Sequence, residues 1–80
     1  MGRKEKLRLR LNSIPKDFTW DELVSLLKQN GFEVINGSGS RYKFFHREQN
    51  KLLSYHKPHP SNIVKEYVLK EVISTLDEII

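Results

Sequence analysis

Residues 39–60 hold most of the side chains in this chain that could do chemistry. All three histidines (His46, His56 and His59) lie in this stretch, together with five cations and one acid, Glu48. Imidazoles titrate near neutral pH, and guanidinium groups can bind phosphate oxygens through two hydrogen bonds at once. The stretch therefore predicts a surface that handles phosphate groups. The five cations are Arg41, Lys43, Arg47, Lys51 and Lys57.

The formal net charge of +4 is unevenly distributed along the chain. Residues 1–10 and residues 41–60 each contain five cations and one acid, whereas residues 11–40 and 61–80 each contain two cations and four acids. Positive charge segregated in this way favours a polyanionic partner over charge that serves only solubility.

Composition narrows the class of protein. Eighty residues, 38% of them apolar, are enough for one small domain with a single core. The chain has no cysteine, which excludes a disulfide framework and a thiolate metal site. Three histidines with few carboxylates nearby make a poor zinc set, so we expect no metal and no cofactor. No apolar run approaches the roughly 18 residues of a membrane span, and residues 1–12 lack the apolar core of a signal peptide, so we expect a cytoplasmic protein.

The first 15 residues allow two interpretations. Leu7, Leu11 and Ile14 are spaced as on one side of a short helix that ends before the next proline. Alternate leucines from Leu7 onward also fit a strand. We therefore expect residues 1–15 to be a basic arm or a short helix, followed by a domain over residues 16–80.

A helix is predicted over residues 20–30. Thr19 and Glu22 form a capping-box pattern, in which hydroxyl and carboxylate satisfy each other's free backbone amides at a helix start. A stripe of leucines follows, and Asn30 with Gly31 supplies a typical stop.

Three strands are expected next. Residues 32–35 form a short strand, and the Gly/Ser-rich residues 36–40 form a loop. Residues 41–46 and 51–56 are strands joined by a polar turn at residues 47–50.

The turn fixes how the last two strands pair. If residues 47–50 close it, Arg41 faces His56 and Lys43 faces Ser54, and these four side chains share the open side of the sheet. A slip of one residue would bury the cations, which favours this register. The intervening side chains then pack on the helices, namely Tyr42, Phe44, Leu53 and Tyr55.

A final helix completes an α+β domain. Pro58 and Pro60 end the third strand, and Ser61 or Asn62 can cap a helix that runs to about residue 78. The resulting order is helix, three-stranded antiparallel sheet, helix, with both helices on one face, as in double-stranded-RNA-binding domains. The expected buried side of the last helix comprises Val64, Tyr67, Val68, Val72, Leu76 and Ile79.

Several short motifs, in this order and spacing, resemble those of HicA-type toxins, the mRNA interferases of bacterial type II toxin–antitoxin pairs. The likeness covers about residues 16–78 and includes Gly39-Ser40-Arg41 and the final His56-Lys57-Pro58-His59-Pro60. The resemblance implies a double-stranded-RNA-binding-like α-β-β-β-α fold and an endoribonuclease (a hydrolase). It also implies a HicB-type antitoxin that occupies the active face.

One departure from the family pattern determines the candidate catalytic residues. Typical members place a catalytic histidine directly after the Gly-Ser pair, where this chain has Arg41. RNA cleavage without a metal needs a base for the 2′-hydroxyl, a cation for the phosphorane and, ideally, an acid for the leaving oxygen. His56, across from Arg41, is the expected base, and His59, between two prolines, is the expected second group. His46, on the other side of its strand, is the weakest catalytic candidate.

The remaining candidates contact RNA. We expect Lys43 and Lys57 to bind phosphates together with Arg41. Ser40 is a further RNA-binding candidate, because the loop that it ends could offer backbone amides to phosphate, although the loop lacks the Lys-Ser/Thr of a P-loop and no helix follows it. Phe45 could stack a base, or equally serve as a packing or antitoxin contact. The cations also fit a purely structural role, in which they protect an exposed sheet face from aggregation.

Three functions therefore stay open from the sequence. The first is an RNA-cleaving toxin. The second is a nucleic-acid-binding module without catalysis, for which the basic face suffices. The third is a protein-interaction domain whose cationic face meets an acidic partner.

Overall fold

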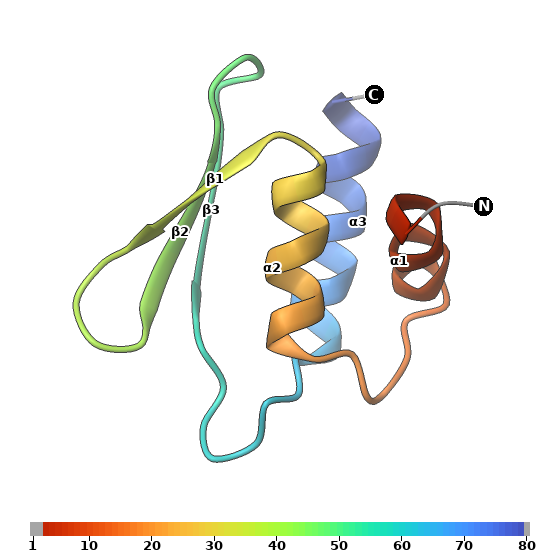
Figure 1. Ribbon diagram of the computed structural model, residues 1–80, viewed down its shortest axis with the longest axis vertical. Coiled ribbons are helices and arrows are strands. Elements are labelled where there is room, and N and C mark those ends of the chain that lie inside the picture. Colours follow the sequence, from red (N-terminus) through yellow and green to blue (C-terminus); the bar gives the residue numbers. More distant parts are fainter. Residues whose placement is uncertain (1–2, 80) are drawn as a thin grey trace.

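The computed structural model of the protein describes residues 3–79, in which three helices and three strands form. Figure 1 shows the strands on one side of α2 and α3, and α1 on the far side of these helices. This is the expected α-β-β-β-α layout of a double-stranded-RNA-binding-like fold, preceded by the short N-terminal helix α1. In chain order the elements are α1 (Arg3–Asn12), α2 (Trp20–Gln29), β1 (Phe32–Asn36), β2 (Arg41–His46), β3 (Lys51–His56) and α3 (Glu66–Ile79).

The start of α2 confirms the predicted capping box. The Thr19 hydroxyl accepts a hydrogen bond from the Glu22 backbone N–H at 3.2 Å, and the Thr19 N–H donates to the Glu22 carboxylate at 3.0 Å. At the other end, Gly31 has a φ of +92°, a left-handed conformation that favours glycine. The helix therefore begins and ends where its sequence signals place it.

The sheet has the order β1-β2-β3 and is antiparallel throughout. Along β2 and β3, Arg41 pairs with His56 and Lys43 pairs with Ser54, which confirms the predicted register. Phe44 is fully buried against the helices, while its neighbours along β2 point to the open side. The turn at residues 47–50 and the alternation of side chains were sufficient to fix this arrangement.

The start of α3 differs from the prediction. The expected caps at Ser61 and Asn62 are wrong, because the helix begins at Glu66. The intervening chain is extended, and its backbone pairs with the segment that precedes α2: Ile63 forms a bridge with Thr19. Backbone groups used in this pairing cannot also start a helix, so α3 begins only after it.

The later start also changes which residues α3 buries. Tyr67, expected in the core, is 66% exposed, whereas Leu69, absent from the expected set, is fully buried. Val64 is buried as expected, but it lies in the connection before α3 and not in the helix. Val68, Val72 and Leu76 are buried as expected.

The N-terminal segment is a helix and not a strand. Leu11 of α1 is fully buried in the core, and Leu7 and Ile14 pack against the same cluster. α1 therefore covers the side of the helical layer that faces away from the sheet (Figure 1). Among residues 3–79, none of the helices combines the length and apolar character needed to cross a membrane.

Candidate functional site

The open side of β2 and β3 carries the candidate catalytic pair. Arg41, at the start of β2, and His56, at the end of β3, are direct cross-strand partners, and both are exposed. Directly opposed residues in an antiparallel sheet have their Cβ atoms about 4.5–5.5 Å apart, on the same side. The predicted cross-strand pairing of Arg41 with His56, with both residues exposed to solvent, is confirmed.

The loop before β2 holds the His56 ring. The Ser40 hydroxyl oxygen lies 3.4 Å from His56 Nδ1, and the backbone N–H of Lys57 donates to the Ser40 carbonyl at 2.8 Å. The same loop is closed by the Gly37 N–H, which donates to the Arg41 carbonyl at 2.9 Å. Ser40, which directly precedes Arg41 in the chain, thus contacts His56 at Nδ1, and Nε2 is not involved in that contact.

The sheet cations differ from those of α1 in their surroundings. Arg8 pairs with Asp77 at 2.5 Å, and Arg10 pairs with Glu22 at 2.7 Å. The Arg10 guanidinium lowers the pKa of the Glu22 carboxyl from its usual 4.5, mainly through this hydrogen bond. Two of the five cations in the N-terminal segment are therefore paired with acids within the fold.

No comparable neutralisation occurs around the candidate site. Among residues 3–79, Arg41, Lys43 and Lys57 take part in no salt bridge, and all three are exposed. By contrast, Arg47 pairs with Glu33 and Lys51 with Glu78. These three cations are thus neighbours of His56 along the chain or across the two strands, an arrangement that favours an anion there.

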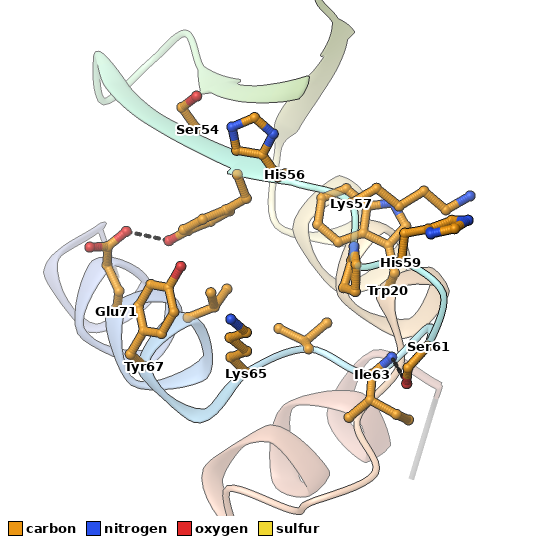
Figure 2. Close-up of a pocket in the computed structure, with 14 residues that line it drawn as sticks. Trp20, Ser54, His56, Lys57, His59, Ser61, Ile63, Lys65, Tyr67 and Glu71 are labelled. Carbon is orange, nitrogen blue, oxygen red and sulfur yellow. Dashed lines mark hydrogen bonds between the residues drawn. The ribbon is translucent and has the colours of Figure 1, made fainter. Parts of the chain in front are cut away.

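His59 lies on the connection after β3 and is also exposed. It lines the same pocket as His56, but Figure 2 shows its ring pointing away from the His56 ring. The structure therefore places both imidazoles at one pocket without bringing them face to face.

His46 is separated from this group. It is only 9% exposed, packs edge-on against Phe32 with ring centroids 5.1 Å apart, and accepts a hydrogen bond from the Gln49 N–H at its Nδ1. A Cβ atom on Gly31 would approach His46 Nε2 to 2.8 Å, so the ring also fills the space beside that glycine. His46 serves packing, as its position on the other side of β2 suggests.

Phe45 lies further along the open side. It is half-buried, opposite Leu52, which is 57% exposed, and next to Glu33 of β1. It lies four positions along β2 from Arg41, or about 13 Å away at the usual rise per residue. With Ile35, which is 47% exposed, it forms an apolar patch beside the cations.

A pocket of about 500 Å³ adjoins the candidate site, between β3, the connection that follows it, and α3. Trp20, itself 3% exposed, lines it together with His56, Tyr67 and Glu71 (Figure 2). Sequence reasoning missed the α3 side of this pocket because it placed Tyr67 in the core. The pocket depends on the pairing of residues 18–20 with residues 62–64, and no signal for this pairing exists in local periodicity.

The hydroxyl of Tyr55 donates a short hydrogen bond to Glu71 inside this pocket. Burial and this carboxylate both raise the pKa of Tyr55 above its usual value. The phenol therefore stays protonated and holds the Glu71 carboxylate in place.

Comparison with known families decides the identity of the domain. A family model described as the HicA toxin of bacterial toxin–antitoxin matches residues 20–77, from the start of α2 almost to the end of α3. The chain belongs to the HicA toxin family. Comparisons with curated proteins and with solved structures give no match. Members of the HicA family are toxins that are paired with an antitoxin. The matched range contains every candidate site residue and omits α1.

Proposed function

We propose that this HicA-family protein is an endoribonuclease toxin that cleaves RNA in the cytoplasm without a metal ion. The observation that carries the proposal is the cross-strand pair of Arg41 and His56 on the exposed side of the sheet. The pair supplies a proton acceptor and a phosphate-binding cation side by side, and the family supplies the context of a toxin.

In the proposed reaction His56 is the general base. It removes the proton of a ribose 2′-hydroxyl, and the 2′-oxygen attacks the adjacent phosphorus. The new bond joins the 2′-oxygen to phosphorus, and the bond from phosphorus to the 5′-oxygen breaks. The products are a 2′,3′-cyclic phosphate and a 5′-hydroxyl, so DNA, which lacks the nucleophile, is not a substrate.

Ser40 positions the base. A neutral imidazole has one ring nitrogen that donates and one that accepts. When Nδ1–H donates to the Ser40 hydroxyl oxygen, the lone pair of Nε2 is free to take the proton of the substrate. The contact of 3.4 Å is long for a hydrogen bond, and such contacts commonly shorten once substrate is bound.

Arg41 stabilises the transition state. The phosphorane carries one more negative charge than the ground state, and a guanidinium group aimed at its oxygens gains strength as that charge develops. Lys43 and Lys57 contact flanking phosphates, an arrangement supported by the absence of acidic partners for them among residues 3–79. Phe45 offers an aromatic ring to a more distant base.

His59 is the proposed acid. It protonates the departing 5′-oxygen, because it borders the same pocket as His56 and is exposed to solvent. Its ring must turn toward the scissile phosphate when RNA is bound, since it points away from His56 in the free protein (Figure 2).

The double substitution His56→Ala/His59→Ala tests the proposal. Both side chains are exposed, so the fold should be retained, while growth arrest on expression and cleavage of RNA by the purified protein should be lost. Lys28→Ala, an exposed position on α2, is the matched control and should leave both activities intact. Full toxicity of the double variant would refute the proposed mechanism.

A non-catalytic RNA-binding module is the second candidate. It is favoured by Arg41, which stands where the HicA family usually carries a histidine. This alternative predicts binding that weakens steeply with salt, with RNA that remains intact after long incubation. The analysis of product ends separates the two candidates, because only the first creates cyclic phosphates.

The proposed protein partner is a HicB-type antitoxin that covers the open side of the sheet. Support comes from the exposed apolar side chains of Ile35 and Leu52 beside the cations, which leave a mixed surface suited to a protein partner. Replacing Leu52 with Asp should weaken capture of a HicB-type antitoxin while leaving RNA cleavage intact. Unchanged capture would place the antitoxin on another face.

A further inference from the structure

We propose that the pocket beside His56 is a base-binding subsite that selects guanine in the RNA substrate, an inference that rests on the proposed ribonuclease function. The pocket, of about 500 Å³, lies within the range of about 300–1,000 Å³ typical of small-molecule sites. His56 belongs to both the pocket and the sheet pair, so a nucleotide whose phosphate meets Arg41 would have its base near the pocket.

Tyr67 is the stacking platform of this subsite. It is 66% exposed, although it belongs to a helix whose other large side chains are mostly buried, and it lines the pocket (Figure 2). Single-stranded RNA is commonly recognised by stacking unpaired bases on aromatic rings of this kind. Trp20 instead contributes the floor, because it is 3% exposed and packs edge-on against Tyr42 and Phe44.

Glu71 gives the subsite its chemical preference. A carboxylate repels phosphate but accepts hydrogen bonds from N–H groups. Its position beside several cations therefore indicates that it binds the N–H donors of a base. The Tyr55 hydroxyl donates a hydrogen bond to Oε1 of Glu71. This bond fixes the carboxylate and leaves Oε2 able to accept further hydrogen bonds. The raised pKa of Tyr55 keeps this donor protonated.

Guanine matches this acceptor better than the other bases. Its Watson–Crick edge presents two adjacent donors, N1–H and the N2 amino group, whereas adenine and cytosine each place an acceptor next to their amino group, and uracil flanks its single N–H with two carbonyls. Lys65 lines the same pocket, and its amino group points inward in Figure 2, where it can donate to the guanine O6. A carboxylate and an ammonium group on one pocket therefore complement the donor and acceptor ends of a guanine edge.

Binding of the four ribonucleoside 3′-monophosphates to the full chain tests the assignment without requiring cleavage. Calorimetry gives the affinities, and the emission of Trp20, the single tryptophan, reports whether the ligand occupies the pocket. We expect guanosine 3′-monophosphate to bind at least about tenfold more tightly than the other three, with a saturable change in Trp20 emission. Equal affinities, a preference for another base or an unchanged Trp20 emission would overturn the proposal.

Substitutions at Tyr67 and Glu71 separate the contribution of base stacking from that of hydrogen bonding to the edge of the base. Tyr67→Ala should weaken the binding of all four nucleotides about five- to tenfold. Tyr67→Phe should bind them as the wild type does, because the aromatic ring provides the stacking. Glu71→Gln should remove the preference for guanine while its amide oxygen still accepts from Tyr55. Ser74→Ala, exposed on α3 and outside the pocket, is the control. A guanine preference that survives Glu71→Gln would contradict the role of the carboxylate.

The two proposals fail in different ways. If the wild-type protein cleaves RNA but binds no guanosine 3′-monophosphate, the subsite is wrong and the ribonuclease function stands. If it binds this nucleotide selectively but leaves RNA intact, the pocket is a recognition site and the proposed catalysis is wrong.

Discussion

Arg10 on α1 and Arg41 on β2 belong to the two most basic segments of the chain, yet their surroundings are opposite. Arg10 donates hydrogen bonds to Glu22 and Asp17, whereas Arg41 has no salt bridge among the described residues and stands beside His56. A cation already paired within the fold contributes to stability and little to the binding of an anion. The basic charge of the chain therefore divides into cations that are paired with acids and cations that are open to solvent.

Removing the unpaired cation should have the largest effect. In Arg41→Ala, cleavage of an oligoribonucleotide should fall about 100- to 1,000-fold, as when one preorganised donor to a developing charge is lost. The melting temperature should be unchanged, because Arg41 is exposed and forms no salt bridge with any residue from 3 to 79. Arg41→Lys keeps the charge without the planar fork and should give an intermediate rate.

Arg47→Ala is the matched control for that variant. Arg47 is an exposed arginine of the same hairpin, but it pairs with Glu33 across the sheet. Its removal should change the cleavage rate less than about threefold. Equal losses in the two arginine variants would show that overall charge, and not the position of Arg41, governs activity.

Disrupting the paired region should affect stability and leave catalysis unchanged. Glu22→Ala removes both the capping box of α2 and the partner of Arg10, which should lower the free energy of unfolding by about 1–2 kcal/mol in urea titrations. Glu22→Gln keeps an oxygen for the cap and should cost less. At 25 °C both variants should cleave RNA at the wild-type rate.

The difference in unfolding free energy between wild type and Glu22→Gln should depend on pH, and the direction of that dependence follows from the pKa of Glu22. Because the pKa of Glu22 is lowered in the folded state, its charge stabilises the fold above the usual carboxyl value of 4.5. That stabilisation is lost as the pH falls through the lower folded value, where Glu22 takes up a proton. The gap in stability between wild type and Glu22→Gln should therefore shrink on acidification below pH 4.5, and a constant gap would contradict the ion pair.

Salt dependence measures how many sheet cations meet phosphates. Binding of a 2′-O-methyl oligonucleotide, which cannot be cleaved, should weaken about three- to tenfold in Lys43→Ala. The slope of log affinity against log salt should fall by about 0.7, the value for one phosphate contact to a single strand. Lys28→Ala on α2 should leave the slope unchanged, and equal slopes in all three proteins would remove Lys43 from the interface.

The smallest expected effect belongs to Ser40. Ser40→Ala removes the contact to His56 Nδ1 but leaves the backbone bond from Lys57, so the imidazole keeps its approximate place. We expect the turnover rate to fall about two- to fivefold, with little change in substrate affinity. A loss in affinity without a change in turnover would indicate that Ser40 binds phosphate directly and does not position the ring.

The sheet could be derived from the sequence because its determinants are local. The polar turn at residues 47–50 and the alternation of apolar and charged side chains leave one register that buries Phe44 and exposes Arg41. The start of α2 followed equally from Thr19 and Glu22.

The features that could not be predicted from the sequence depend on contacts between segments that are distant along the chain. The bridge between Thr19 and Ile63 delays the start of α3, and this delay turns Tyr67 out of the core and into the pocket. Likewise, the acids that neutralise Arg8 and Arg10 lie on other elements, so a count of charge along the chain could not separate paired cations from unpaired ones. Periodicity and composition carry no information about such pairings.

The rate of a single turnover by His56→Ala tests the central claim most directly. Purified wild-type and variant proteins are mixed in excess with an oligoribonucleotide, and the appearance of 2′,3′-cyclic phosphate ends is followed with time. The account predicts a rate at least about 100-fold lower for the variant, with an unchanged melting temperature, because the exposed imidazole acts as the base. A variant rate within about twofold of wild type would contradict the role of the Arg41 and His56 pair.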